Sequence, residues 1–231
     1  MFELRKYLKS FFYKASPYTQ AGQDLFAYEQ FGYNGTYIDI GAGEPQRGNN
    51  CYMLEVQKNW RGFSVEFGDS DQEKRDALKS RWKKYPERKN KIYWDDAMSF
   101  DYKKGLLENE LNNDIDFLSC DIDPQESTLI ALKKVLNDGV RPKYIAFETD
   151  HYREKIDYSN LAYNFLKPYG YKIGVKDVYS NLKKKKIFET WFVSEALDLK
   201  TINYKDWVKN IKFYVIKKSN ETSTKASLCK T

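Results

Sequence analysis

The chain has 231 residues, of which 41% are hydrophobic, 16% aromatic and 31% charged. The length is typical of one domain, and the aromatic content excludes a disordered chain. The net charge of +6 permits an anionic partner, although lysines mixed with acidic residues are also typical of a solvated surface.

Several sequence features bear on the compartment of the protein. The apolar runs are all much shorter than the roughly 20 residues of a membrane-spanning helix. The N-terminus alternates basic and apolar residues, so it lacks the uninterrupted apolar stretch of a signal peptide. The three cysteines, Cys51, Cys120 and Cys229, are spaced too widely for a disulfide framework or a zinc site. We therefore expect a protein of the reducing cytoplasm with no transmembrane segment.

The two ends of the chain differ from its middle. Apolar residues at helical spacing between residues 2 and 13 predict a short amphipathic helix within an N-terminal segment 1–20. Such a helix covers part of the domain's own core or, alternatively, lies on a membrane surface. Residues 217–231 are polar and predict a disordered tail. The intervening residues 21–216 form the predicted domain.

Strands and helices alternate through the predicted domain. The predicted strands cover residues 35–41, 63–67, 91–94, 115–120 and 143–147, and the predicted helices cover residues 49–60, 69–85, 126–136 and 158–166. Two further strands, 171–178 and 187–194, flank a basic turn and predict an antiparallel hairpin. This order indicates an α/β protein with a mostly parallel sheet covered by helices on both faces. In such sheets the ligand lies beyond the carboxyl ends of the strands.

The residues after the first two strands suit a nucleotide-containing cofactor. Gly41 and Gly43 follow the first strand, where glycines let a ligand approach the backbone closely. A dinucleotide-binding loop would continue to a third glycine, but Gln46 occupies that place, which disfavours NAD. Glu66 ends the second strand and could accept hydrogen bonds from the ribose hydroxyls of NAD or of S-adenosylmethionine (SAM). Alternatively, Glu66 is a surface carboxylate.

Two adjacent acidic residues, Asp95 and Asp96, end the third predicted strand. In the same layout, this position lies near the exocyclic amine of adenine, and one carboxylate could accept its hydrogen bond. Alternatively, the pair forms a turn or caps a helix.

Six short segments between Gly22 and Ser194 follow one another with a characteristic order and spacing. They are Gly22–Phe26, Gly35–Glu44, Asn49–Glu55, Asn59–Glu66, Phe117–Pro124 and Ile145–Tyr152. Together they resemble the motifs of FkbM-type SAM-dependent methyltransferases. The resemblance implies a Rossmann-like class I methyltransferase fold, with a seven-stranded, mostly parallel sheet whose last strand is antiparallel, and SAM as the cofactor. The cofactor-binding residues that it implies, besides the two aspartates above, are Asp39, Gly41, Gly43, Glu66 and Asp121.

Methyl transfer to a hydroxyl requires that the hydroxyl lose its proton, so we expect a base near the reacting oxygen. His151 is the only histidine and follows the fifth predicted strand. It is either the base, an acceptor-orienting group or an exposed loop residue. Asp121 and Asp123 follow the fourth strand and compete for the role of base, unless one of them caps the next helix.

A divalent metal ion is an alternative that we do not favour. Asp121, Asp123, Glu148 and Asp150 carry hard oxygen ligands suited to Mg²⁺ or Ca²⁺. If these carboxylates lie close together without a cation, their mutual repulsion raises the pKa of at least one of them.

These features favour a SAM-dependent O-methyltransferase that acts on a hydroxyl, with a sugar or glycan as the acceptor expected from the resemblance. A second interpretation keeps SAM but makes the acceptor a ribose hydroxyl of a nucleic acid, which the net charge and the Lys183–Lys186 run allow. A third is a non-catalytic binding or structural protein on a methyltransferase-like scaffold. The sequence does not indicate the oligomeric state.

Overall fold

A computed structural model describes residues 16–153, 155–179 and 186–209. The predicted N-terminal helix and the predicted tail over residues 217–231 lie outside the described residues, as does the basic turn up to residue 185. No helix within the described ranges is both long and apolar enough to cross a bilayer.

Eight strands form one sheet in the order β3-β2-β1-β4-β5-β7-β6-β8. The strands are β1 (Thr36–Ile40), β2 (Arg61–Val65), β3 (Lys91–Tyr93), β4 (Phe117–Cys120), β5 (Tyr144–Glu148), β6 (Tyr171–Tyr179), β7 (Ile187–Ser194) and β8 (Ile202–Asn203). The helices are α2 (Gln23–Phe31), α3 (Tyr52–Lys58), α4 (Gln72–Trp82), α5 (Tyr102–Glu108), α6 (Gln125–Asn137) and α7 (Tyr158–Leu166), followed by the 3₁₀ helix η1 (Lys167–Tyr169). The mostly parallel sheet that the sequence predicts is therefore confirmed.

The strand count is a correction, because the sheet has eight strands and not seven. β7 is antiparallel to β5 and β6, as the predicted hairpin required, while β8 pairs parallel with β6 at the edge of the sheet. β8 has only two residues, too few for any periodicity to show in the sequence.

The chain order opens a crevice between β1 and β4. From β1 the chain continues to β2 and β3 on one side, and then returns to β4 and β5 on the other. Two neighbouring strands whose connections diverge in this way leave a crevice at their carboxyl ends, which is where open α/β sheets bind ligands.

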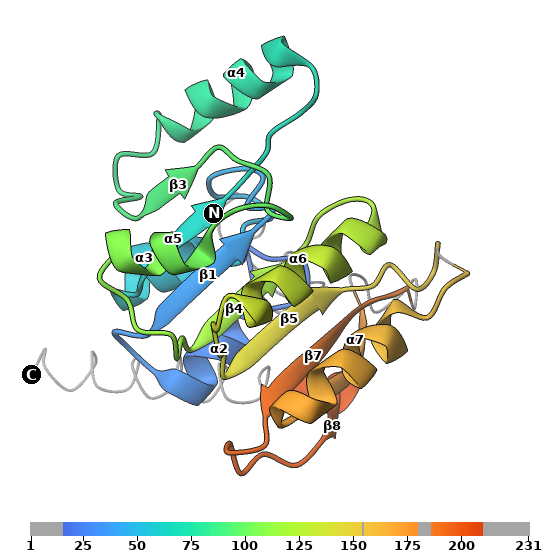
Figure 1. The fold of residues 1–231 in the computed structure, drawn as a ribbon. Helices are drawn as coiled ribbons and strands as arrows, with labels where there is room; N and C mark the ends of the chain where they lie inside the picture. The colour runs from blue at the N-terminus through green and yellow to red at the C-terminus, as the bar shows by residue number, and fades with distance from the viewer. Residues whose placement is uncertain (1–15, 154, 180–185, 210–231) are drawn as a thin grey trace, which may run out of the picture.

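Helices cover both faces of the sheet because successive strand residues point to opposite sides. Ile38 and Leu118 belong to the core under α5, α6 and α7, whereas Tyr37 and Phe117 belong to the core under α2 and α3. Figure 1 shows α6 over the near face of β4 and β5 and α7 over the near face of β7, while α4 extends at the top beyond β3.

An aromatic cluster closes the α2 face and joins the two ends of the described chain. Phe26, Tyr144, Trp191, Tyr204 and Trp207 pack with ring centroids about 5–6 Å apart, at angles typical of tilted and edge-to-face pairs. The Tyr204 hydroxyl donates to the Ala21 carbonyl (2.7 Å), across 183 positions of sequence. The Trp207 indole donates to Glu29 Oε2 (2.8 Å). Segments far apart in sequence therefore form one hydrophobic core.

The sequence did not predict α5, because a glycine interrupts its pattern. Gly105 lies in the middle of this short helix, where glycine costs about 1 kcal/mol relative to alanine. A Cβ placed on Gly105 would lie 2.8 Å from Phe63 Cζ and 2.9 Å from Phe100 Cε1, both in fully packed rings. The close approach of α5 to the sheet therefore requires the glycine.

We predict that Gly105→Ala destabilises the protein, although helix propensity alone predicts the opposite. Overpacking a filled core costs about 1–3 kcal/mol, which exceeds the gain in propensity. The measurement is urea unfolding of the variant beside Lys103→Ala, an exposed position of the same helix. A Gly105→Ala protein more stable than the wild type would contradict the packing that we describe.

Candidate functional site

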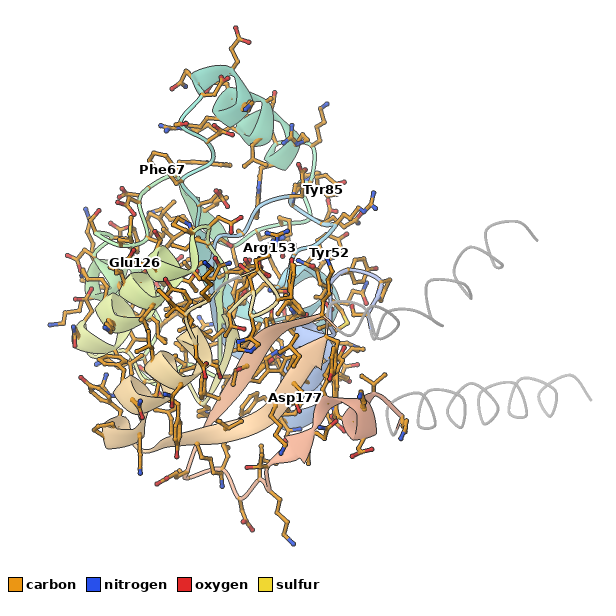
Figure 2. The ribbon with its side chains drawn as sticks, turned by 90° about the vertical axis from the view of Figure 1, so that its right-hand side faces the viewer. Tyr52, Phe67, Tyr85, Glu126, Arg153 and Asp177 are labelled. Carbon is orange, nitrogen blue, oxygen red and sulfur yellow. The ribbon has the colours of Figure 1, made fainter. Side chains whose placement is uncertain are left out.

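A pocket of about 400 Å³ lies at the carboxyl ends of β1, β2, β3 and β4, at the crevice that the strand order opens. Its lining residues are Gly41, Val65, Glu66, Phe67, Gly68, Asp96, Ala97, Met98, Asp121, Ile122, Asp123 and Ser127. In Figure 2, Phe67 marks the β2 side of this region, below α4, and Glu126 marks the start of α6. Five of the residues predicted from the sequence line the pocket: Gly41, Glu66, Asp96, Asp121 and Asp123.

Gly41 brings the loop after β1 against the loop after β4. Its φ is +73°, a left-handed conformation that favours glycine. A Cβ built at this position would lie 1.8 Å from the Asp121 carbonyl oxygen and 2.6 Å from a methyl group of Ile122. No side chain fits between the two loops, so the backbone of Gly41 itself forms part of the pocket wall.

Glu66 joins two loops of the pocket through its carboxylate. Oε2 accepts from the Gly43 N–H (2.7 Å), and Oε1 accepts from the Gly68 N–H (2.6 Å). Burial raises the pKa of Glu66, while these two backbone hydrogen bonds lower it. Each carboxylate oxygen keeps a further lone pair for a ligand. Gly43 does not line the pocket and acts instead on Glu66 through its N–H.

The structure separates Asp95 from Asp96. Asp96 lines the pocket, and its Oδ1 accepts from the Met98 N–H (2.9 Å), which fixes the turn after β3. Asp95 is exposed, lies outside the pocket lining, and accepts from the Asp96 N–H (2.8 Å). Both aspartates accept hydrogen bonds from backbone N–H groups of the turn after β3, and Asp96 also lines the pocket.

Asp39 lies beneath the pocket and not in its wall. It is buried near the end of β1, where Asn49 Nδ2 donates to Oδ2 (3.3 Å). Burial raises the pKa of Asp39 to about 6, against the lowering effect of the Arg88 guanidinium. This carboxylate supports the loop after β1, since Asn49 also donates to the Ala42 carbonyl (2.9 Å).

Asp121 and Glu148 form a hydrogen-bonded pair of carboxyl groups. Burial, together with the hydrogen bond and the charge of Asp121, raises the pKa of Glu148 far above its usual range. The pKa of Asp121 is raised as well, by burial and by the charges of Asp123 and Asp150, while its bond to Glu148 lowers it. At neutral pH the pair therefore shares one proton, which Glu148 donates to the ionised Asp121.

Glu189 is a buried acidic residue that the sequence reasoning missed. It lies opposite Glu148 in the β5–β7 register, near the start of β7. Gln23 Nε2 donates to Oε1 (2.7 Å), and the Trp191 indole donates to Oε2 (2.6 Å). Burial raises the pKa of Glu189 to about 8. The available signal was an acidic residue near the start of an otherwise apolar strand. Because that strand is antiparallel, it begins at the edge of the sheet where the parallel strands end.

His151 lies apart from the pocket. It is exposed in the turn after β5 and is not among the lining residues. Its neighbour Asp150 is buried and forms an ion pair with Arg153 (2.9 Å). Of the three predicted catalytic residues, the structure therefore places Asp121 and Asp123 in the pocket wall and His151 outside it.

The four acidic residues considered for a metal are not arranged as ligands of one ion. Within the described part of the chain, no group of three or more histidine, cysteine, aspartate or glutamate side chains has a geometry that could hold a metal. Glu148 is bonded to Asp121, and Asp150 faces Arg153. Protonation relieves the repulsion between these carboxylates, as the raised pKa values of Asp121 and Glu148 indicate.

No protein-family model and no curated protein matches the sequence. Among solved structures, the human methyltransferase 10 domain containing protein is similar over 76% of this chain and 81% of its own, with 13% identity and a TM-score of 0.50. The chain has the Rossmann-like fold of SAM-dependent methyltransferases. Two weaker similarities are to Aeropyrum pernix fibrillarin with natively bound SAM (16% identity, 70% and 67% covered, TM-score 0.46) and the METTL16 MTase domain (15% identity, 74% and 66% covered, TM-score 0.48).

The shared proton of this methyltransferase fold predicts a pH dependence of stability. Between about pH 6 and 9 the folded protein keeps the proton of the Asp121–Glu148 pair, whereas the unfolded chain has lost it. The unfolded state then binds fewer protons, so the free energy of unfolding falls as the pH rises, by about 1.4 kcal/mol per pH unit for one proton. Glu148→Gln keeps a donor to Asp121 without a titrating proton, so we expect a shallower decline.

The measurement is urea unfolding of the wild type and Glu148→Gln at several pH values between 6 and 9. Glu126→Gln, at an exposed position at the start of α6, is the matched control and should keep the slope of the wild type. Equal slopes for the wild type and Glu148→Gln would mean that the pair does not retain its proton.

Proposed function

We propose that the protein is a SAM-dependent methyltransferase whose cofactor binds in the pocket between β1 and β4. The observation that carries the proposal is the pocket wall, which Gly41, Glu66, Asp96 and Asp121 form from the ends of four different strands. This is the crevice where the fold class binds ligands, and it combines a close backbone approach with acidic hydrogen-bond acceptors. The missing third glycine disfavours NAD in the same crevice.

Each part of the pocket suits a different part of the cofactor. Glu66 would accept hydrogen bonds from the ribose hydroxyls, and Asp96 from the exocyclic amine of adenine. The apolar side chains of Phe67, Met98 and Ile122 would flank the adenine ring. When bound, SAM would supply an electrophilic methyl group, which a correctly positioned acceptor oxygen would take while S-adenosylhomocysteine leaves.

We propose that the acceptor is a hydroxyl and that Asp121 takes its proton. The Asp121 carboxylate lies in the pocket wall, and burial raises its pKa, which makes it a stronger base than an ordinary aspartate. Glu148 holds this carboxylate in place through the shared proton, so it acts as a positioning residue. Asp123, which also lines the pocket, is the second candidate base, and His151 remains the candidate that would have to reach in from outside.

The acceptor class follows from the sequence resemblance. The six motifs between Gly22 and Ser194 support membership of the FkbM-type methyltransferases, with a sugar or glycan hydroxyl as the acceptor. A ribose hydroxyl of a nucleic acid is the second candidate, and a basic groove beside the pocket, described below, favours it. The buried free thiols of Cys51 and Cys120 support a reducing, cytoplasmic location.

We predict that SAM and its demethylated product S-adenosylhomocysteine bind with micromolar affinity, measured by calorimetry, and that NAD does not bind. Glu66→Gln removes the charge of the ribose acceptor and should weaken binding about tenfold, since a hydrogen bond to a charged group contributes about 1.5–3 kcal/mol. Asp96→Asn should also weaken binding, whereas its matched control, Asp95→Asn, should not. Folded protein that binds neither SAM nor S-adenosylhomocysteine would refute the proposal.

We further predict that Asp121→Asn lowers kcat by about 10²–10⁴-fold, the usual contribution of a general base. His151→Ala should leave kcat within a factor of about two, because this histidine lies outside the pocket wall. The assay measures formation of S-adenosylhomocysteine against a panel of glycans and RNAs. A loss of activity in His151→Ala that equals the loss in Asp121→Asn would assign the base to the histidine instead.

A further inference from the structure

A second hollow of about 430 Å³ lies between α4 and β3, next to the loop after β1. Its lining residues are Lys79, Trp82, Lys83, Arg88, Asn90, Ile92 and Trp94, and we call it the α4–β3 groove. All three charged side chains in this lining are basic. Figure 2 shows α4 at the top of the molecule, with Phe67 and Tyr85 marking the places where its two ends join the domain.

The chain segment beside this groove is rich in basic residues, three of which, Arg81, Arg88 and Lys91, form ion pairs with Glu44, Glu55 and Glu108. Residues 79–91 contain seven lysines and arginines and one acidic residue, Glu87, which is a net charge of +6. The whole chain also has a net charge of +6, so the charges of all other residues cancel.

The cations of the groove have different roles. Arg88 is buried and donates to Glu55 Oε2 (2.6 Å) and to the Pro45 carbonyl (2.6 Å), so it serves the structure. Lys79 and Lys83, in contrast, have no carboxylate within 4 Å among the described residues. Two unneutralised ammonium groups at one hollow are a binding surface for an anion.

Two tryptophans give the groove flat apolar walls. Trp82 and Trp94 stand perpendicular, with their ring centroids 6.4 Å apart, and Trp94 is half-buried. Lys79 Nζ lies 5.5 Å from the centre of the Trp94 ring. Aromatic faces beside unpaired lysines are the combination with which proteins hold single-stranded nucleic acids, through base stacking and phosphate contacts. The described lining includes no carboxylate that could accept from the many hydroxyls of a glycan.

We propose that the α4–β3 groove binds single-stranded nucleic acid, with a base against Trp94 and the adjoining phosphates on Lys79 and Lys83. This binding does not depend on methyl transfer. The groove also lies against the cofactor pocket, because the Trp82 indole donates to the Gly43 carbonyl (2.8 Å) and the Gly43 N–H donates to Glu66 (2.7 Å). If the proposed methyl transfer holds, this binding favours the second candidate acceptor, a ribose hydroxyl of the bound nucleic acid, over a glycan hydroxyl.

The test is fluorescence anisotropy of labelled oligouridine and oligothymidine with the full chain, without SAM. We expect Lys79→Gln/Lys83→Gln to weaken binding about tenfold. The slope of log K against log[salt] should become shallower, by the amount that corresponds to the loss of about one to two phosphate contacts. Trp94→Ala should weaken binding by about fivefold or more, and Trp94→Phe should restore part of it, since stacking needs only an aromatic face. Lys103→Gln/Lys167→Gln, an equal charge change at exposed sites outside the groove, should bind like the wild type.

Calorimetry of the same variants with SAM separates this inference from the proposed function. Retained SAM affinity shows that the variants are folded and that any loss concerns the groove. Failure of the wild type to bind either oligonucleotide would overturn the inference, even if SAM binds. Oligonucleotide binding that the groove variants leave unchanged would also overturn it, as would binding of heparin, a sulfated glycan, without binding of either oligonucleotide.

Discussion

The two backbone hydrogen bonds of Gly43 are the constraint on which both hollows of this protein depend. Its N–H donates to Glu66, which lines the pocket between β1 and β4, and its carbonyl accepts from Trp82, which lines the α4–β3 groove. These two groups belong to consecutive peptide units, so a single residue separates the pocket from the groove. Because Glu66 also accepts from the Gly68 N–H, this carboxylate connects the loop after β1 to the loop after β2.

Buried carboxyl groups at the carboxyl ends of β4 and β5 and near the start of β7 keep protons that exposed carboxyl groups would lose. Burial and mutual repulsion keep one proton on the Asp121–Glu148 pair and raise the pKa of Glu189 to about 8. A dry acidic edge is costly for stability at high pH, and it is also what gives a carboxylate enough basicity to accept a proton from a hydroxyl. Burial of these carboxyl groups therefore lowers the stability of the fold at high pH, while it raises the basicity that the proposed chemistry needs.

Much of the fold could be predicted from the sequence, because parallel strands and amphipathic helices carry clear periodicities. The bounds of β7 and α7 agree with their predictions at both ends. The two-residue β8 and the glycine-containing α5 carry no such signal. At the site, Glu66 and Asp96 could be predicted to lie near the pocket because each follows a strand. The sequence does not show that Asp96 lines the pocket and Asp95 does not, or that Glu189 lies opposite Glu148. Those relations depend on turn geometry and register, which only the folded chain fixes.

The contacts between the first and last described segments have a consequence for how the protein is made. Tyr204 and Trp207 cover the face of α2 and bond to Ala21 and Glu29, nearly the full length of the domain away in sequence. On a ribosome, the aromatic face of α2 stays open to water until residues near position 207 have left the exit tunnel. The domain therefore completes its core only after these residues have emerged, and until then the exposed aromatic face of α2 favours aggregation of the nascent chain.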